Sequence, residues 1–188
     1  QAGCLSISVL LTYAVVYHIN GVSRVIILYV LILVFVLVGF LFFNLSRPVA
    51  KIFMGDCGSQ VLGFALSVLP LIPNPEGYES ADIQFAAVIL MLPIFDTIAA
   101  IWRRLRDKQP VGQGDRFHLH HKLMLIGFSP RGALGIFMIF QIIINLFTAL
   151  SIILRGFEAM VILMGIILIG VLFFTLIHYE KEKIINKQ

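Results

Sequence analysis

Long hydrophobic runs alternate with short polar segments along the whole chain. A helix needs about 20 predominantly apolar residues to cross a bilayer. Backbone polar groups in hydrocarbon must be satisfied within such a segment, so each run is expected to be a helix. The pattern predicts an all-α, polytopic membrane helix bundle of about six transmembrane helices, at about residues 2–17, 25–43, 57–73, 84–102, 132–154 and 158–178.

Composition agrees with this prediction. The 188 residues are 60% hydrophobic and 13% charged, and the mean hydropathy is +1.00. A soluble domain carries about 25% charged residues, so an ordinary soluble domain is excluded. We therefore predict that residues 1–188 form a single integral membrane domain. Cys4 and Cys57 lack the spacing of metal ligands and are expected to be buried thiols.

The basic residues predict the orientation of the chain in the membrane. With six spans, all but Arg24 and Arg155 of the fourteen Lys and Arg residues fall on one side. Because cytoplasmic loops carry the excess of Lys and Arg, residues 44–56 and the His-containing loop 103–131 are expected to be cytoplasmic. This bias also accounts for the pI near 9.3, so no nucleic-acid partner is expected.

The first polar motif is "KIFMGDCGSQVLGF", residues 51–64, at the start of a predicted span. Asp56 lies between Gly55 and Gly58, with Ser59 close by. An Asp before an apolar run can cap a helix by accepting hydrogen bonds from free N–H groups. Flanking glycines and a serine also suit a phosphate or metal site at a helix N-terminus. Both interpretations remain open from the sequence.

The second motif is "MLPIFDTIAAIWRR", in which Asp96 lies about two turns inside the predicted span 84–102. A carboxylate within a membrane span is costly and indicates function. The alternative is a polar contact between helices, with Thr97 or an arginine of the following loop. Pro93 is expected to bend the helix and make room beside Asp96.

The third motif is "PVGQGDRFHLHHKLMLIGFSP", residues 110–130. Imidazole and guanidinium groups clustered here suit phosphate binding, and a proton relay is an alternative. A structural zinc site usually has four ligands with wider spacing. A loop held only by anionic lipid would need Lys and Arg rather than histidines. The cluster therefore favours a functional site, formed by Asp115, Arg116, His118, His120 and His121.

Together the motifs resemble the polyprenyl-phosphate N-acetylhexosamine-1-phosphate transferase family. The segment "FMGDCGSQVLGF" (53–64) is similar to the family's Gly-Asp-x-Gly-Ser motif. The segment "PIFDTIAAIWRRLRDKQPVGQGDRFHLHHKL" (93–123) is similar to its Pro-x-x-Asp motif and the basic loop that follows, and "GFSPRGAL" (127–134) also fits. The Asp-Arg-x-His-x-His-His form resembles the bacterial branch that uses UDP-N-acetylglucosamine.

This resemblance implies a Mg²⁺-dependent glycosyl-1-phosphotransferase (or one using Mn²⁺) in the bacterial inner membrane. It would transfer a sugar-1-phosphate, N-acetylglucosamine-1-phosphate above all, from a UDP-amino sugar to undecaprenyl phosphate, a polyprenyl phosphate. The reaction would occur at the cytoplasmic face and release UMP. It would be the first membrane step of cell-envelope polysaccharide synthesis, for example of lipopolysaccharide or teichoic acid.

The resemblance also implies roles for individual residues. Asp56 would be a metal ligand and catalytic. The loop histidines would be catalytic and hold the diphosphate: His118, His120 and His121. The implied substrate-binding residues are Arg116, Asp115, Gly55, Ser59 and Asp96.

The family also has an earlier Asp-Asp pair and an Asn- and Asp-rich loop, and neither occurs in this sequence. "QAGCLSIS" resembles the residues after that second loop. We therefore expect a C-terminal part of a larger transferase, inactive alone. The alternatives are a catalytically incomplete membrane remnant that binds lipid or a partner, and a proton-coupled transporter. Spans 25–43 and 132–154 carry no charged residue, which disfavours the transporter. The sequence leaves open whether a homodimer forms.

Overall fold

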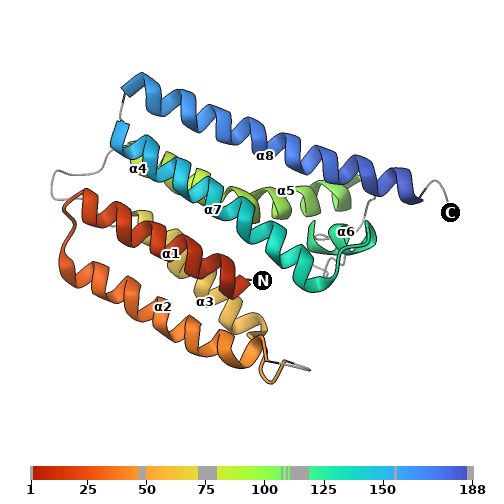
Figure 1. Cartoon of the computed structure of the whole chain (residues 1–188), viewed down its shortest axis with the longest axis horizontal. Coiled ribbons are helices and arrows are strands. Elements are labelled where there is room, and N and C mark those ends of the chain that lie inside the picture. The colour runs from red at the N-terminus through yellow and green to blue at the C-terminus, as the bar shows by residue number, and fades with distance from the viewer. Residues whose placement is uncertain are drawn as a thin grey trace.

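The computed structural model describes residues 2–46, 50–71, 80–106, 108, 110, 119–154 and 156–185, without the side chains of 80–84, 120 and 178–185. These residues form helices and no strand, which confirms the all-α class (Figure 1). In chain order the helices are α1 (Ala2–Ile19), α2 (Arg24–Asn44), α3 (Gly55–Val68), the 3₁₀ helix η1 (Leu69–Leu71), α4 (Ser80–Ile89), α5 (Met91–Arg106), α6 (Leu119–Leu125), α7 (Pro130–Leu154) and α8 (Gly156–Ile185).

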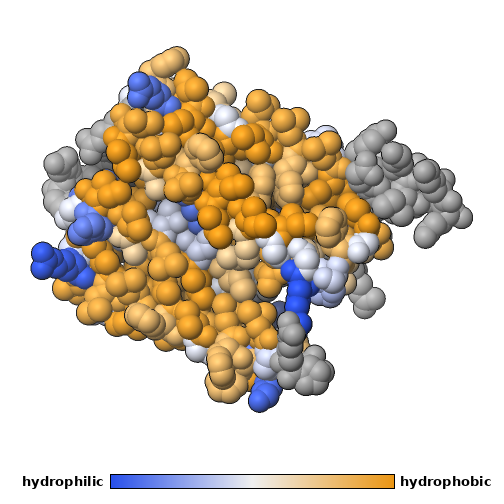
Figure 2. All heavy atoms as spheres, in the orientation of Figure 1, coloured by the Kyte–Doolittle hydropathy of each residue, from blue (hydrophilic) through white to orange (hydrophobic). Residues whose placement is uncertain are grey.

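Four helices in the described residues are long and apolar enough to cross a membrane: α1, α2, α7 and Gly156–Ile177 of α8. The face drawn in Figure 2 is mostly hydrophobic, and most hydrophilic residues lie towards its edges, with a few near its middle. Large apolar side chains such as Phe42 and Phe157 are about four-fifths exposed. A surface this apolar suits lipid rather than water. The other two predicted spans coincide with α3 and η1, and with α4 and α5.

The predicted span 84–102 is not one continuous helix. It is divided into α4 and α5, which meet at Leu90. Pro93 has no N–H to donate to the carbonyl of Ile89, four residues earlier, and its ring crowds that carbonyl. The interruption therefore falls within the turn that precedes Pro93, where the sequence predicted a bend.

Two hydrophobic clusters hold the helices together. One joins α1, α2 and α3 through side chains such as Leu10, Val34 and Leu62. The other joins α5, α6, α7 and α8 through side chains such as Leu92 and Phe137. Helix α7 lies between α1 and α8 and contacts both (Figure 1).

The expectation of two buried thiols is wrong for Cys57, which is exposed, whereas Cys4 is half-buried. Helix α3 buries Leu62, and its opposite side carries the exposed Val61 and Phe64. Cys57 lies near the start of this helix, where little of the described chain covers it.

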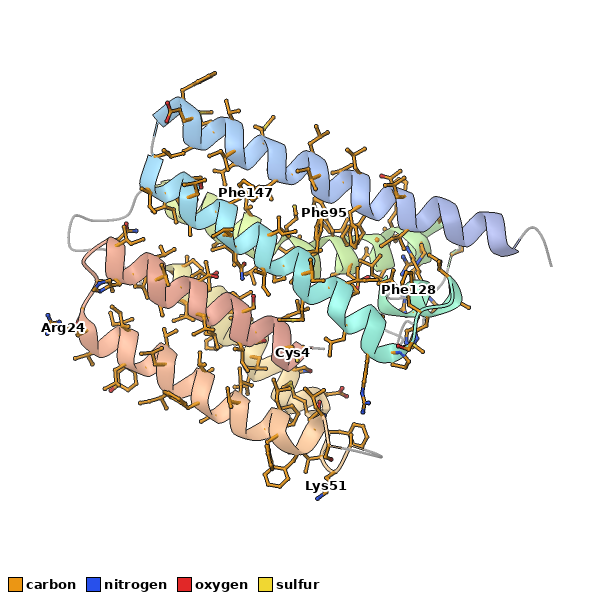
Figure 3. All side chains as sticks on the ribbon, in the orientation of Figure 1. Cys4, Arg24, Lys51, Phe95, Phe128 and Phe147 are labelled. Atoms are coloured by element: carbon orange, nitrogen blue, oxygen red, sulfur yellow. The ribbon has the colours of Figure 1, made fainter. Side chains whose placement is uncertain are left out.

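The polar motifs lie at one end of the bundle. The start of α3, the C-terminal end of α5 and helix α6 gather there (Figure 1). The turn between α1 and α2 and the junction of α7 with α8 lie at the other end. Lys51 and Arg24 project from opposite ends (Figure 3). This arrangement agrees with the separation of basic residues expected from the sequence.

Candidate functional site

The Gly-Asp motif forms the first turn of α3. Gly55 has φ +65°, a left-handed conformation that glycine adopts without strain. The N-cap residue is Met54, which makes no side-chain capping hydrogen bond. Asp56 lies in the first helical turn and is exposed. The helix is thus not capped by Asp56 as one interpretation supposed, and its carboxylate lies at the positively polarised end of the helix.

Small residues fit this turn closely. A Cβ atom built on Gly58 would lie 2.7 Å from Cγ of Met54, so a larger residue would displace that side chain. The hydroxyl of Ser59 donates to the backbone carbonyl of Asp56 at 2.9 Å. The turn that presents Asp56 is therefore specified by its neighbours.

Asp96 ties α5 to the start of α6. The backbone N–H of Leu119 donates to Oδ1 of Asp96 at 2.9 Å. Leu119 is the first residue of α6, and the first N–H groups of a helix have no partner within it. A carboxylate is favourable at this position because it also complements the helix dipole. Asp96 therefore fixes where the helix carrying His120 and His121 begins.

The hydrogen bond from Leu119 to Asp96 involves a backbone N–H, whereas the sequence suggested a contact with Thr97 or an arginine of the following loop. Thr97 instead donates its hydroxyl to the carbonyl of Pro93 at 2.8 Å, within its own helix. Asp96 also has a further interaction within the chain. Asp96 is half-buried at the side of α5. Its carboxylate therefore accepts a structural hydrogen bond and is still partly exposed at the surface of the protein.

A second tie holds the other end of the His-containing loop. Arg104 is buried, and its Nη1 donates to the carbonyl of Pro110 at 3.0 Å. The loop 103–131 is thus attached to α5 at Pro110 and again at Leu119. His121 is half-buried in α6. Asp115, Arg116 and His118 lie outside the described residues, as does the side chain of His120.

Two of the motifs meet at one cavity. A cavity of about 300 Å³ lies between α1, α3, α5 and α7. Ser59 from the Gly-Asp motif and Asp96 from the Pro-x-x-Asp motif both line it. Its other walls are mostly apolar, from residues such as Leu5, Leu62 and Phe137. Segments far apart in the sequence therefore place polar groups around a shared space.

A buried amide network supports this cavity and was missed in the sequence. Gln141 is fully buried, and its Nε2 donates to the carbonyl of Ile89 and to Oδ1 of Asn145, both at 2.8 Å. Nδ2 of Asn145 donates to the hydroxyl of Ser8 at 2.6 Å and to its carbonyl at 3.1 Å. Gln141 thus satisfies the carbonyl that Pro93 leaves free. The signal was a row of polar residues on one face of an apolar span.

We expect Gln141→Leu to destabilise the fold by about 1–3 kcal/mol, because the Ile89 carbonyl and Asn145 lose a buried partner. The measurement is thermal unfolding of the purified protein in detergent. Thr148→Val is a matched control, since Thr148 is equally buried and its hydroxyl bonds to Ile144 of its own helix. The two variants should unfold at clearly different temperatures.

A second substitution tests the cause. Ala at position 93 restores an N–H that can donate to the Ile89 carbonyl, so Pro93→Ala should recover part of the stability lost in Gln141→Leu. Purely additive effects of the two substitutions would contradict this explanation of the network.

The fold and the site define a polytopic membrane protein with its polar motifs gathered at one end of the bundle. The model of glycosyl transferase family 4 matches residues 1–74. This match confirms the resemblance inferred from the motifs. No solved structure gives a significant match to the chain.

Curated relatives are named as polyprenyl-phosphate transferases. A probable undecaprenyl-phosphate N-acetylglucosaminyl 1-phosphate transferase of Bacillus subtilis is 46% identical over 93 residues, covering 50% of this chain and 25% of that protein. The undecaprenyl-phosphate alpha-N-acetylglucosaminyl 1-phosphate transferase of Pasteurella multocida is 33% identical, covering 54% and 29%. The decaprenyl-phosphate N-acetylglucosaminephosphotransferase of Mycobacterium tuberculosis is 30% identical, covering 70% and 35%. The matched part of the chain thus spans between 25% and 35% of these relatives.

Proposed function

We propose that this chain forms part of an enzyme that transfers N-acetylglucosamine-1-phosphate from UDP-N-acetylglucosamine to undecaprenyl phosphate at the cytoplasmic membrane face. A phosphate oxygen of the lipid attacks the sugar-bearing phosphorus of the nucleotide. The bond from that phosphorus to the bridging oxygen breaks, and UMP leaves with the electron pair. The names of the relatives support the reaction class.

The observation that carries this proposal is the link from Asp96 to Leu119. Asp96 lines the same cavity as Ser59, and Ser59 lies one helical turn after Asp56. Asp96 also accepts a hydrogen bond from the first residue of α6, the helix that carries His120 and His121. All three motifs are thereby joined at the end of the bundle where the predicted cytoplasmic residues gather. A sugar nucleotide from water and a lipid from the bilayer can both reach such a position.

Mg²⁺ fits the described residues as a cation shared with substrate phosphates. No group of three His, Cys, Asp or Glu side chains suited to a metal occurs among the residues that the structure describes. Mg²⁺ is usually held by one or two carboxylates together with phosphates, and the exposed Asp56 provides such a carboxylate. When bound, the cation neutralises the two anionic reactants.

The loop residues would hold the diphosphate. Arg116, His118, His120 and His121 supply donors for phosphate oxygens and stabilise the charge that develops on the departing UMP. Asp115 would orient this group by pairing with Arg116 or a histidine. Asp96 would position the loop through Leu119. The polyprenyl chain would lie against apolar helix surfaces.

The test is UMP release by the protein expressed from its full reading frame, purified in detergent with undecaprenyl phosphate and a panel of UDP-amino sugars. We expect release that requires Mg²⁺, is abolished by EDTA, and is greatest with UDP-N-acetylglucosamine. Release with another sugar would change the donor. A folded protein that releases no UMP with any sugar would instead indicate a non-catalytic membrane protein that binds lipid or a partner.

A further inference from the structure

A groove separate from the cavity described above lies between α5 and α8. Its volume is about 490 Å³. Phe95, Ile98 and Trp102 of α5 and Val171 and Phe174 of α8 form its apolar walls. The rings of Phe95 and Phe174 pack edge to face, with centroids 5.5 Å apart. The groove uses a different face of α5 from the one that carries Pro93 and Asp96 towards the cavity.

Basic side chains line one part of this groove. Arg103 and Arg106 come from the last turn of α5, and Lys122 comes from α6. No acidic residue is among the described residues that line it. Lys122 is only 4% exposed. A buried ammonium group is costly unless other groups hydrogen-bond to it. All three side chains also interact elsewhere within the chain, so an anion here would join existing contacts.

We propose that this groove binds an anionic glycerophospholipid of the bilayer. Its phosphate would lie against Arg103, Arg106 and Lys122, and an acyl chain against the apolar walls. Basic pockets between membrane helices bind the head groups of anionic lipids. Trp102, 67% exposed beside Arg103, has the amphipathic ring that favours the membrane interface. The apolar walls do not suit a sugar nucleotide.

The single tryptophan of the chain provides a direct test, because Trp102 itself lines the groove. The protein expressed from its full reading frame, with any tryptophan other than Trp102 replaced by phenylalanine, is placed in nanodiscs containing a fixed fraction of brominated phosphatidylglycerol or of brominated phosphatidylcholine. Bromine quenches tryptophan fluorescence on contact. We expect deeper quenching by the anionic lipid. Equal quenching by both lipids would overturn the proposal.

Charge variants test the phosphate contacts. Arg103→Gln combined with Arg106→Gln should lower the preference for phosphatidylglycerol by roughly tenfold or more. Lys51→Gln combined with Arg131→Gln removes two charges outside the groove and should leave the preference unchanged. If the double groove variant does not fold, Arg106→Gln alone, at an exposed position, should lower it by roughly fivefold. An unchanged preference in a folded groove variant would contradict the phosphate assignment.

Competition identifies the occupant. Unlabelled undecaprenyl phosphate should displace the brominated phospholipid no better than unlabelled phosphatidylglycerol does. Much stronger displacement would show that the groove holds the proposed substrate lipid, and would overturn the phospholipid assignment. The fluorescence reading requires no catalysis, so its failure is distinguishable from a failure of the proposed transferase activity.

Discussion

Asp56→Asn is expected to lower Mg²⁺-dependent UMP release at least about a thousandfold in the protein expressed from its full reading frame. A metal ion contributes several kcal/mol of charge stabilisation to such a transition state, and each 1.36 kcal/mol corresponds to a factor of ten. Asn keeps the size of the side chain and one oxygen but removes the charge that holds the cation. Activity at raised Mg²⁺ concentration and membrane insertion are measured together.

The fold should tolerate this substitution. Asp56 is exposed and is not the N-cap of α3, so the loss is limited to its interaction with the helix dipole, about 0.3–1 kcal/mol. Cys57→Ala is the matched control, because Cys57 is exposed in the same turn and should retain near-normal turnover. Near-normal turnover of Asp56→Asn would contradict its role as a metal ligand.

The sequence predicts the helices well because hydrophobic runs are local information. Four of the predicted spans correspond to helices long enough to cross a bilayer. The interruption between α4 and α5 follows from Pro93, whose missing N–H acts on a carbonyl four residues away. Such effects depend on residues within one or two turns of each other.

The contacts that build the site could not be predicted in the same way. Asp96 bonds to a backbone group 23 residues later, and Gln141 to one 52 residues earlier. A periodic pattern shows that a helix has a polar face but does not identify the element opposite. The exposed position of Cys57 depends likewise on which helices cover α3. The motifs identified candidate chemistry, and the tertiary structure identified which of those residues share a cavity.

Asp96 should tolerate replacement by Asn, whereas Asp56 should not. Asp96→Ala leaves the N–H of Leu119 without this acceptor, a loss of about 1–3 kcal/mol for a buried donor. The start of α6 would then be released, and kcat/KM for the UDP-sugar should fall about 10- to 100-fold. Hydrogen exchange of the α6 amides, followed by mass spectrometry, should become faster in this variant. Asp96→Asn retains an acceptor oxygen and should restore most of both properties.

The contrast between the two carboxylates separates positioning from metal binding. A backbone N–H needs an acceptor but not a charge, so Asn can replace Asp at position 96. A Mg²⁺ ion needs the charge, so Asn cannot replace Asp at position 56. If Asp96→Asn were as inactive as Asp96→Ala while exchange in α6 stayed slow, the charge of Asp96 would act on the substrate or the cation directly. Asp96 would then be a catalytic residue of the cavity rather than the support of the His-containing loop.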